Sequence, residues 1–461
     1  MNRRDLIRGV LASAGLMLVP RFAWAHGDPW TALPDLLARI VPPRIPRRDF
    51  VLTKYRTIRE AIDAAHRAGG GRVVVPEGEH LTGAIHLRSR VELHLAAGAT
   101  LRFSRDPADY PLVHTRWEGV ELMNYSPLVY AFECEDVAVT GEGTLDGQAD
   151  EEHWWPWKGV TTGKRDDVTK NNDSPAPQLA DRNQLFQQAE DGVPVARRVY
   201  GAGHFLRPSF IEPYRCKNVL IEGITIRNAP FWVMHPTLCT NVTVRGVQVI
   251  SHGPNNDDCD PESSRDVLIE NCMFDTGDDC IALKSGRNAD GRRLNTPVEN
   301  VVIRNCEMKD GHGGITVGSE ITGGARNIFA EKCRLDSPDL ERALRFKTNT
   351  QRGGIIENVY VRDIEIGTVK LAPIEIDLRY EPPSSGPYIP EVRNILVERM
   401  RSKKSKHALY IRGLEQAPVR NVVIRNSVFR GVAAGHIIEG DVELTLDRVI
   451  TEAAPPKGDK P

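Results

Sequence analysis

Four short polar groups with reactive side chains follow one another between residues 255 and 347. They are Asn255-Asn256-Asp257, Asp278-Asp279, Gly311-His312-Gly313 and Arg345-Phe346-Lys347. Each follows a similar apolar phrase at a similar distance, and residues at similar offsets in stacked repeats project from one side of the stack. Three carboxylates, an imidazole and two cations are therefore predicted to converge on one patch.

The three carboxylates of this patch, Asp257, Asp278 and Asp279, indicate acid/base chemistry. Like charges this close cannot all ionise easily, so at least one pKa is expected to rise and leave a proton bound near neutral pH. Glycoside hydrolysis is catalysed by a carboxylic acid beside ionised carboxylates. Aspartate-rich turns also bind calcium, but the imidazole and the two cations of the later groups would repel a metal ion. We therefore predict no metal.

An apolar phrase recurs eight times and predicts the elements that position the patch. The copies begin at Asn218, Asn241, Asp266, Asn300, Asn327, Asn358, Asn394 and Asn421. Positions +1 and +3 are apolar, positions +4 and +5 are polar or glycine, and +6 and +8 are usually apolar again. Two short strands with buried alternate residues, joined by a bend, are typical of one solenoid coil. The predicted fold is an all-β, single-stranded, right-handed parallel β-helix, with the hand taken from the general bias of parallel crossovers.

Three of the eight cysteines, Cys272, Cys306 and Cys333, share position +6 of this phrase. They are predicted to stack inside the β-helix as small apolar side chains. A disulfide or a metal cluster would instead require side chains that face one another.

An amphipathic helix is predicted from Thr57 to Ala68. Thr57 is a helix N-cap with Glu60 three residues later, and Gly69-Gly70-Gly71 ends the helix. The open end of a solenoid needs a cover, so this helix is the expected N-terminal cap.

A polar segment, residues 148–200, is predicted to be a long insertion beside the active cleft. Trp154, Trp155 and Trp157 lie near its start. The sequence leaves two roles open for them, because a tryptophan can stack on a sugar or anchor a loop. The catalytic domain is predicted to span residues 26–452, and 453–461 are predicted to form a disordered tail.

Residues 1–25 are predicted to be a twin-arginine signal peptide. Arg3-Arg4 precedes an apolar run, and Ala23-Trp24-Ala25 is a small-x-small cleavage signal. The run is too short for a permanent bilayer span. The net charge of −2 lacks the basic surplus of nucleic-acid proteins. We therefore expect a periplasmic or secreted protein, a monomer or weak oligomer, with no nucleic-acid or membrane partner.

The four polar groups resemble, in order, the Asn-Thr-Asp, Asp-Asp, Gly-His-Gly and Arg-Ile-Lys motifs of the pectin-hydrolysing polygalacturonases, glycoside hydrolase family 28. The resemblance covers roughly residues 50 to 450. It implies that Asp278 is the general acid of an inverting hydrolysis and that Asp257 and Asp279 position and activate water. It also implies that His312 assists the ionisation of the acid. The implied ligand is a pectic oligo- or polysaccharide, held by Asn255, Arg345 and Lys347, and no cofactor is implied.

The sequence departs from these motifs at several places. Asn256 replaces Thr and Phe346 replaces Ile, both at positions that do not react. Asp258 stands where glycine is common and would add a negative charge near the site. Gly277 precedes the Asp pair where many endo-acting members carry Gln. With the insertion at 148–200, Gly277 makes the chain resemble the exo-acting bacterial members.

Three alternatives remain open from the sequence. The enzyme could hydrolyse a branched pectin such as rhamnogalacturonan or xylogalacturonan, it could be a calcium-dependent pectate lyase, or it could be a β-helix that only binds. The last would be expected to lack the Asp pair, which is present. Asp260 is expected to brace its own turn, and His235 is expected to be a packed residue rather than a reactive one.

Overall fold

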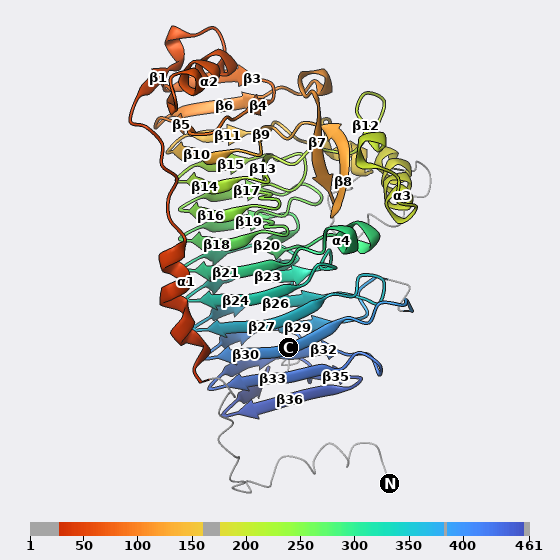
Figure 1. The fold of residues 1–461 in the computed structure, drawn as a ribbon. Coiled ribbons are helices and arrows are strands. Elements are labelled where there is room, and N and C mark those ends of the chain that lie inside the picture. The colour runs from red at the N-terminus through yellow and green to blue at the C-terminus, as the bar shows by residue number, and fades with distance from the viewer. Residues whose placement is uncertain (1–26, 160–175, 382–384, 456–461) are drawn as a thin grey trace, which may run out of the picture.

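The computed structural model describes residues 27–159, 176–381 and 385–455. Successive turns of the chain stack into long parallel sheets that wind around one axis (Figure 1). The predicted right-handed parallel β-helix is confirmed. The predicted leader, residues 1–25, lies outside the described residues. Within the described residues, no helix has the length and apolar character required to cross a bilayer.

The first sheet has 13 parallel strands and contains the eight predicted phrases. Its strands are β1 (Asp49–Val51), β2 (Gly71–Val75), β5 (Val91–Leu95), β10 (Glu135–Gly141), β14 (Lys217–Glu222), β16 (Thr240–Arg245), β18 (Arg265–Glu270), β21 (Val298–Arg304), β24 (Ala325–Glu331), β27 (Ile355–Arg362), β30 (Glu391–Glu398), β33 (Val419–Arg425) and β36 (Val442–Asp447). The second sheet has 12 strands. These are β3 (Gly78–Thr82), β6 (Ala99–Phe103), β11 (Thr144–Asp146), β15 (Thr225–Arg227), β17 (Gln248–Ser251), β19 (Met273–Thr276), β22 (Glu307–Met308), β25 (Arg334–Leu335), β28 (Glu365–Thr368), β31 (Arg401–Lys404), β34 (Val428–Val432) and β37 (Ile450–Ala453). β37 thus extends one residue into the predicted tail, of which residues 456–461 lie outside the described ranges.

The third sheet positions the polar groups and has six strands. These are β20 (Asp279–Leu283), β23 (Gly313–Gly318), β26 (Arg342–Lys347), β29 (Ala372–Asp377), β32 (Leu409–Arg412) and β35 (Ile437–Glu439). Isolated bridges from Ile281 through Cys259 and Met234 to Ile211 continue it into a three-stranded sheet formed by β4 (Ile85–His86), β9 (Val129–Phe132) and β13 (Ile211–Tyr214).

The Asn or Asp that opens each phrase has a structural reason to be there. All eight adopt a left-handed backbone conformation, with φ between 51° and 61°, which Asn and Asp tolerate better than other L-residues. Their side chains also form a ladder between coils. Asn241 Nδ2 donates to Asn218 Oδ1 at 2.7 Å, and Asn327 Nδ2 donates to Asn300 Oδ1 at 3.1 Å. The phrase therefore begins at a repeated corner of the coil.

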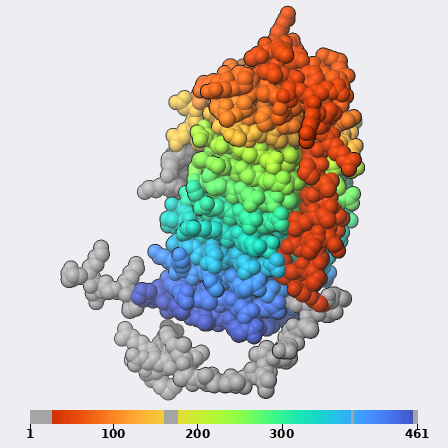
Figure 2. All heavy atoms as spheres, turned by 90° about the vertical axis from the view of Figure 1, so that its left-hand side faces the viewer, coloured from red at the N-terminus to blue at the C-terminus, as the bar shows by residue number. Residues whose placement is uncertain are grey.

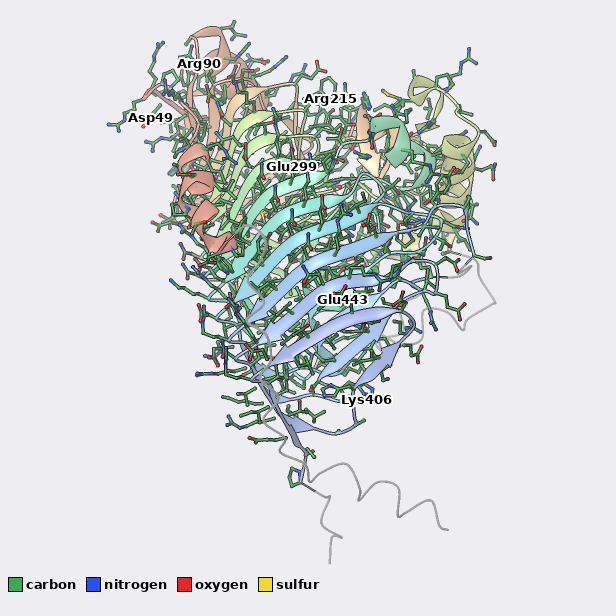
Figure 3. All side chains as sticks on the ribbon, turned by 60° about the horizontal axis from the view of Figure 1, so that its bottom comes forward. Asp49, Arg90, Arg215, Glu299, Lys406 and Glu443 are labelled. Atoms are coloured by element: carbon green, nitrogen blue, oxygen red, sulfur yellow. The ribbon has the colours of Figure 1, made fainter. Side chains whose placement is uncertain are left out.

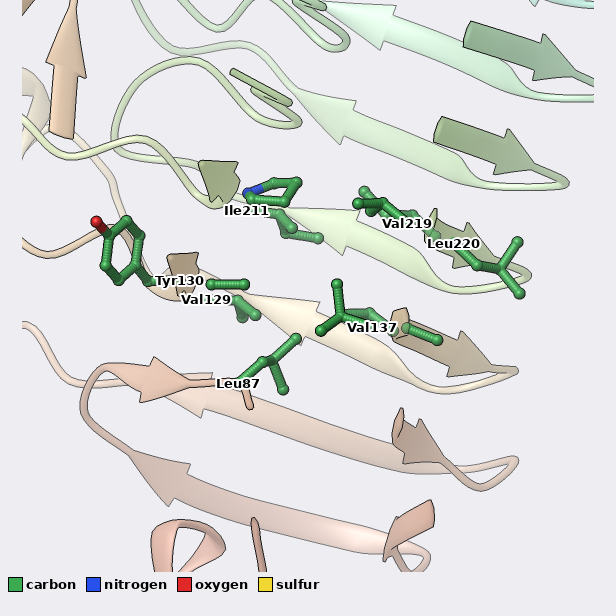
Figure 4. A pocket seen from close by; sticks show the side chains of 12 residues that line it. Leu87, Val129, Tyr130, Val137, Ile211, Val219 and Leu220 are labelled. Atoms are coloured by element: carbon green, nitrogen blue, oxygen red, sulfur yellow. The ribbon is translucent and has the colours of Figure 1, made fainter. Parts of the chain in front are cut away.

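The interior of the coils is an apolar core. Cys272, Cys306 and Cys333 are each 2% exposed and free, and the residues directly after them are paired in register between successive coils. The predicted stack is therefore confirmed, and no disulfide joins its members. Figure 4 shows an apolar cavity between early coils, lined by residues such as Leu87 and Val137, with a volume of about 10 Å³. A space of this size and lining is a packing gap rather than a ligand site.

The outer faces of the sheets are charged. Figure 3 shows side chains such as Glu299 on β21 and Glu443 on β36 on the surface of the coils. Many of these charges pair between neighbouring coils; for example, Arg326 Nε donates to Glu299 Oε2 at 2.6 Å. Exposed pairs of this kind contribute little stability each, so the apolar core is the main source of cohesion.

The predicted cap is present as α2 (Ile58–Arg67), close to its expected bounds. Thr57 Oγ1 accepts a hydrogen bond from the Glu60 backbone N–H, and Glu60 Oε2 accepts one from the Arg56 N–H. The buried face of α2, which includes Ile58 and Ile62, joins the core of the first coils. Two short 3₁₀ helices, η2 (Leu52–Lys54) and η3 (Pro107–Asp109), also lie near this end of the chain.

An N-terminal strap was not expected from the sequence. It contains η1 (Pro29–Ala32) and α1 (Leu33–Arg39) and runs along the side of the coils (Figure 2). Its apolar residues pack on Leu268, Val302 and Phe329, which face outward from the first sheet. These outward apolar residues on otherwise polar strands explain where the strap docks.

A group of elements stands on one side of the coils (Figure 1). They are the antiparallel hairpin of β7 (Leu112–Trp117) and β8 (Val120–Tyr125), η4 (Trp155–Lys158), α3 (Pro177–Glu190), η5 (Val195–Arg197), β12 (Val199–Tyr200) and α4 (Asn288–Leu294). β12 pairs with β8, and α3 contacts β8, η4 and α4. We refer to residues 112–125, 154–159, 177–207 and 288–294 as the wall. The predicted insertion supplies part of it, and the hairpin was not foreseen.

The tryptophans of the insertion anchor the wall. Trp154 is 3% exposed, with its ring centroid 4.9 Å from that of Trp157. Trp155 Nε1 donates to the Ala229 carbonyl at 2.9 Å, and Trp157 packs against Tyr125. These contacts support the anchoring role that the sequence had left open beside sugar stacking.

Candidate active site

Strand register brings the four polar groups to one region of the third sheet. Asp279 on β20 is level with Gly313 on β23, and Lys347 on β26 is level with Gly318 of β23. The segment after Asp257 joins the same stack, because the Asp258 N–H donates to the Asp279 carbonyl at 3.0 Å. The convergence predicted from the repeat is therefore present.

The three carboxylates lie together, with one oxygen from each of Asp257, Asp278 and Asp279 within 4.8 Å of the others. Two cations contact one of them: Lys347 Nζ lies 2.7 Å from Asp279 Oδ2, and Arg345 Nη1 lies 3.3 Å from Asp279 Oδ1. All of these groups except Asp278 are buried. The arrangement offers acid/base groups beside cations that suit an anionic ligand.

His312 completes the cluster. Its Nδ1 lies 3.0 Å from Asp278 Oδ1, and both side chains remain partly exposed. The glycine after His312 is required by close packing, because a Cβ at Gly313 would lie 2.7 Å from Asp279 Oδ1. Gly313 thus lets Asp279 approach the next coil.

Burial raises the pKa of Asp257 above its ordinary value, against the opposing charge of Lys284 and with added repulsion from Asp278 and Asp279. One raised pKa was expected from crowding, and the structure shows that burial is the larger cause. Of the three carboxyls, Asp257 therefore has the greatest affinity for a proton, and the sequence could not have identified it.

The other two carboxyls shift the opposite way. Burial would raise the pKa of Asp278, but the charge and hydrogen bond of His312 outweigh it and hold the pKa well below its ordinary value. For Asp279, Lys347 and then Arg345 outweigh burial, and its pKa is lowered. The charge of Asp278 raises the pKa of His312. Asp278 and His312 therefore share one proton as an ion pair.

Lys284 is a site residue that sequence reasoning missed. Its Nζ lies 3.3 Å from Asp257 Oδ2 and 3.2 Å from Glu320 Oε2, and 4.6 Å from the ring centroid of Trp232. Lys284 lies directly after β20 and outside the four motifs. The sequence offered one signal for Lys284. It is the fifth residue after Asp279, and it follows the inward-facing residues Ile281 and Leu283.

Arg207 is a second missed residue. Its Nη2 donates to Asn255 Oδ1 at 2.9 Å, and its Nη1 donates to the Pro254 carbonyl at 2.7 Å. It holds the first motif from a segment 48 residues away in the chain. No repeat or motif marks that segment, so the sequence carried no signal for it.

Asn256 and Gly277, two of the departures from the family pattern, have structural explanations. Asn256 Oδ1 accepts from Ser251 Oγ at 2.6 Å, and its Nδ2 donates to the Phe231 carbonyl at 3.1 Å. A Cβ at Gly277 would lie 2.1 Å from the Gly253 carbonyl oxygen. Gly277 is therefore required by the packing of adjacent turns, and not only by the space beside Asp278.

The structure corrects two expectations about nearby acids. Asp258 is buried, and burial raises its pKa well above the ordinary value, which opposes the negative charge expected there. Asp260 does not brace its turn, because neither of its carboxyl oxygens has a hydrogen-bond partner among the described residues. His235 is fully buried, with Nε2 2.8 Å from Glu262 Oε2, in agreement with its expected packed role.

Among the described residues, two groups of side chains have the spacing of a metal site. The first is Asp257, Asp278 and Asp279, but each of these carboxylates already contacts a cation: Lys284, His312, or Lys347 with Arg345. Those cations disfavour a divalent ion there. The second is His252, Asp275 and Asp310, in which His252 pairs with Asp275 at 3.1 Å. That pair lies outside the four polar groups.

A family model described as glycosyl hydrolases family 28 matches residues 203–440, which contain all four polar groups. The chain belongs to this family.

A solved structure, the hyperthermoactive exopolygalacturonase from Thermotoga maritima, is 43% identical, with a TM-score of 0.86 over 92% of this chain and 96% of that one. The probable polygalacturonase of Vitis vinifera is 26% identical over 78% of this chain. The exo-poly-alpha-D-galacturonosidase of Dickeya chrysanthemi is 26% identical over 70% of it. The alignments cover 66% and 54% of those two relatives.

Proposed function

We propose that this family 28 chain hydrolyses the α-1,4-galacturonosyl bonds of polygalacturonate with inversion and acts from a chain end. The observation that carries the proposal is the cluster of Asp257, Asp278 and Asp279 within 4.8 Å, beside two buried cations. Acid and base groups can cleave a glycosidic bond, and the cations suit a sugar that carries a carboxylate. The exopolygalacturonase from Thermotoga maritima, 43% identical, supports the same reaction.

The geometry supports a role for each residue. Asp278 protonates the leaving oxygen with the proton that it shares with His312, and the glycosidic C–O bond breaks. A water held by Asp257 and Asp279 attacks the anomeric carbon from the opposite face. Asp257 in its ionised form takes the proton of that water, because a raised pKa makes it a stronger base than Asp279, which two cations hold.

Substrate binding is assigned to Asn255, Arg345 and Lys347. The Arg345 guanidinium and the Lys347 ammonium both lie near the ring of Tyr380, at 5.4 Å and 5.2 Å from its centroid. A planar ring beside two cations suits a sugar whose carboxylate pairs with them.

Replacing Lys347 with alanine is expected to raise the Michaelis constant for polygalacturonate by roughly tenfold, because a charge-assisted contact with the substrate carboxylate is lost. Steady-state kinetics would measure this. Lys404→Ala, an exposed lysine on β31, is the control and should leave the constant unchanged. An unchanged Michaelis constant in Lys347→Ala would contradict the assignment.

Exo attack is supported by the wall and the contacts that hold it. Arg116, on the hairpin, has its Nε 3.2 Å from Glu262 Oε1, and both side chains are fully buried. Arg287, just before α4, has its Nη2 3.1 Å from Glu118 Oε2 at the hairpin turn. Buried ion pairs fix the wall against the coils, and a fixed wall beside the acid leaves room for only a chain end. The hairpin and the predicted insertion contribute together.

The early products on polygalacturonate test the mode of attack. Exo attack should release monogalacturonate while the viscosity falls little, because each cut shortens a chain by one sugar. Product chromatography and viscometry on the same samples would measure both. Mixed oligomers with a rapid loss of viscosity would show that the wall does not close the groove.

Hydrolysis is expected to proceed in the presence of a chelator, because acid and base groups need no metal. Reducing ends should accumulate in EDTA without an ultraviolet-absorbing unsaturated product. Loss of activity in EDTA, its return with calcium and unsaturated products would establish the lyase alternative. Parallel incubation with rhamnogalacturonan and xylogalacturonan tests the branched-pectin alternative, and faster cleavage of either would replace the proposed substrate.

The place of action stays a prediction. Residues 1–25 carry the twin-arginine pattern, and a periplasmic or secreted enzyme would meet a pectic polymer. A monomer or weak oligomer remains the expected state.

A further inference from the structure

The wall brings more cations toward the catalytic cluster than it has carboxylates to pair with them. Glu118, at the hairpin turn, lies 3.5 Å from Arg182 Nε on α3 and 3.1 Å from Arg287 Nη2, which also pairs with Glu320 at 2.6 Å. Lys158, at the end of η4, and Arg207 add two further positive charges. Glu118 is thus the carboxylate beside several cations of the wall, and an excess of positive charge favours an anionic ligand.

Arg207 illustrates this excess of positive charge over carboxylates. Its side chain is fully buried, and its hydrogen-bond partners among the described residues are neutral acceptors: the carbonyls of Pro230 and Pro254, Asn255 Oδ1 and Gln178 Oε1. A buried cation without a carboxylate partner is costly. Burial lowers the pKa of Arg207 to about 9, with Glu118 opposing the shift. An anion bound nearby would relieve this cost.

Lys158 is a second cation of this group. It is half-buried and has no hydrogen bond or ion pair within the described part of the chain. Geometry places η4, which ends at Lys158, beside the acid: Trp155 of η4 packs on Gly253, and Gly253 packs on Gly277, the residue before Asp278. η4 also contacts α3, the helix that carries Arg182. The charges of Glu118 and Asp278 act on the Lys158 ammonium in agreement with this position. Arg182, with 28% of its side chain exposed, remains accessible to a ligand in that space.

We propose that Lys158 and Arg182 form a carboxylate-binding subsite for the chain-end sugar, on the wall side of Asp278. The subsite rests on the proposed function and deepens it: the sugar that is released must itself carry a carboxylate. It is separate from Arg345 and Lys347, which contact Asp279 from later coils. Two cationic positions, one on each side of the scissile bond, select a polymer that is acidic at consecutive sugars.

A glycoside with a single sugar tests the subsite. 4-Nitrophenyl α-D-galacturonide has one carboxylate, on the sugar that would occupy the wall side, and 4-nitrophenyl α-D-galactoside has none. The wild-type chain should prefer the galacturonide. Lys158→Met/Arg182→Met should reduce the ratio of kcat/KM values for the two glycosides by roughly tenfold or more, since charge-assisted contacts are lost. If the glycosides are not turned over, the ratio of their inhibition constants against polygalacturonate is measured instead.

Two further variants make the result specific. Arg197→Met changes an exposed arginine of η5 in the same segment and should leave the ratio unchanged. Lys347→Ala should also leave it unchanged, because the nitrophenyl group on that side is neutral. The subsite is overturned if the double variant keeps the wild-type ratio, or if Lys347→Ala lowers it instead. Equal losses on both glycosides would show that the two cations only hold the wall together. A wild-type chain that does not hydrolyse polygalacturonate would reject the proposed function itself.

Discussion

Asp278→Asn should lower turnover on polygalacturonate by about 10²–10⁴-fold, the usual contribution of a positioned general acid. Asparagine has the shape of aspartate but cannot deliver the proton that Asp278 shares with His312 at 3.0 Å. The fold should survive, because the change removes a charge from a crowded site. Reducing-end assays measure turnover, and thermal unfolding checks the fold.

Asp275→Asn is the matched control for this experiment. Asp275 also pairs with a histidine, His252, at 3.1 Å, and it lies three residues before Asp278. Replacing it breaks the same kind of pair outside the proposed catalytic groups, so turnover should stay near wild type. Most activity retained in Asp278→Asn, or an equal loss in Asp275→Asn, would show that Asp278 is not the acid.

Lys284→Met should shift the acid limb of the pH profile of kcat/KM to higher pH. A carboxylate base works only above its pKa, and burial already raises the pKa of Asp257 while Lys284 opposes that rise. Without Lys284 the pKa of Asp257 rises further. At acid pH, kcat/KM should therefore fall by roughly tenfold or more, where each factor of ten corresponds to about 1.4 kcal/mol. The value of kcat/KM should recover as the pH is raised.

Stability provides a second measurement on this variant. Removing one partner of a buried ion pair costs about 3–5 kcal/mol, and Lys284 contacts both Asp257 and Glu320. The melting temperature should fall, and activity is compared well below it. Lys284→Arg keeps the charge and should retain most of the wild-type profile. A fall in activity that is the same at every pH would show that Lys284 supports the fold without tuning Asp257.

The chain also shows how a repeat sequence determines a site. The repeated phrase predicted the coils and the stack of Cys272, Cys306 and Cys333, because inward-facing positions recur at fixed offsets. The same offsets brought Asp278 and His312 to one patch, since equal positions in successive coils lie side by side. These inferences needed only local periodicity, which a single sequence carries.

Other features of the site depended on contacts between segments that no periodicity relates. Arg287 meets Glu118 across 169 residues, and Arg207 reaches Asn255 from the segment that enters the wall. The hairpin, which carries Glu118, is not part of the repeat. The sequence therefore indicated an insertion but not a fixed wall.

The sequence by itself determined the β-helix, the order of its coils and the set of candidate acid/base residues, because local period-two patterning and equal spacing specify them. Only the tertiary structure decided which carboxyl has the greatest affinity for a proton, because the pKa of Asp257 depends on burial and on Lys284. It also decided that burial raises the pKa of Asp258 well above its ordinary value. Burial and the nearest opposite charge are set by the whole packed molecule, and no local pattern contains them.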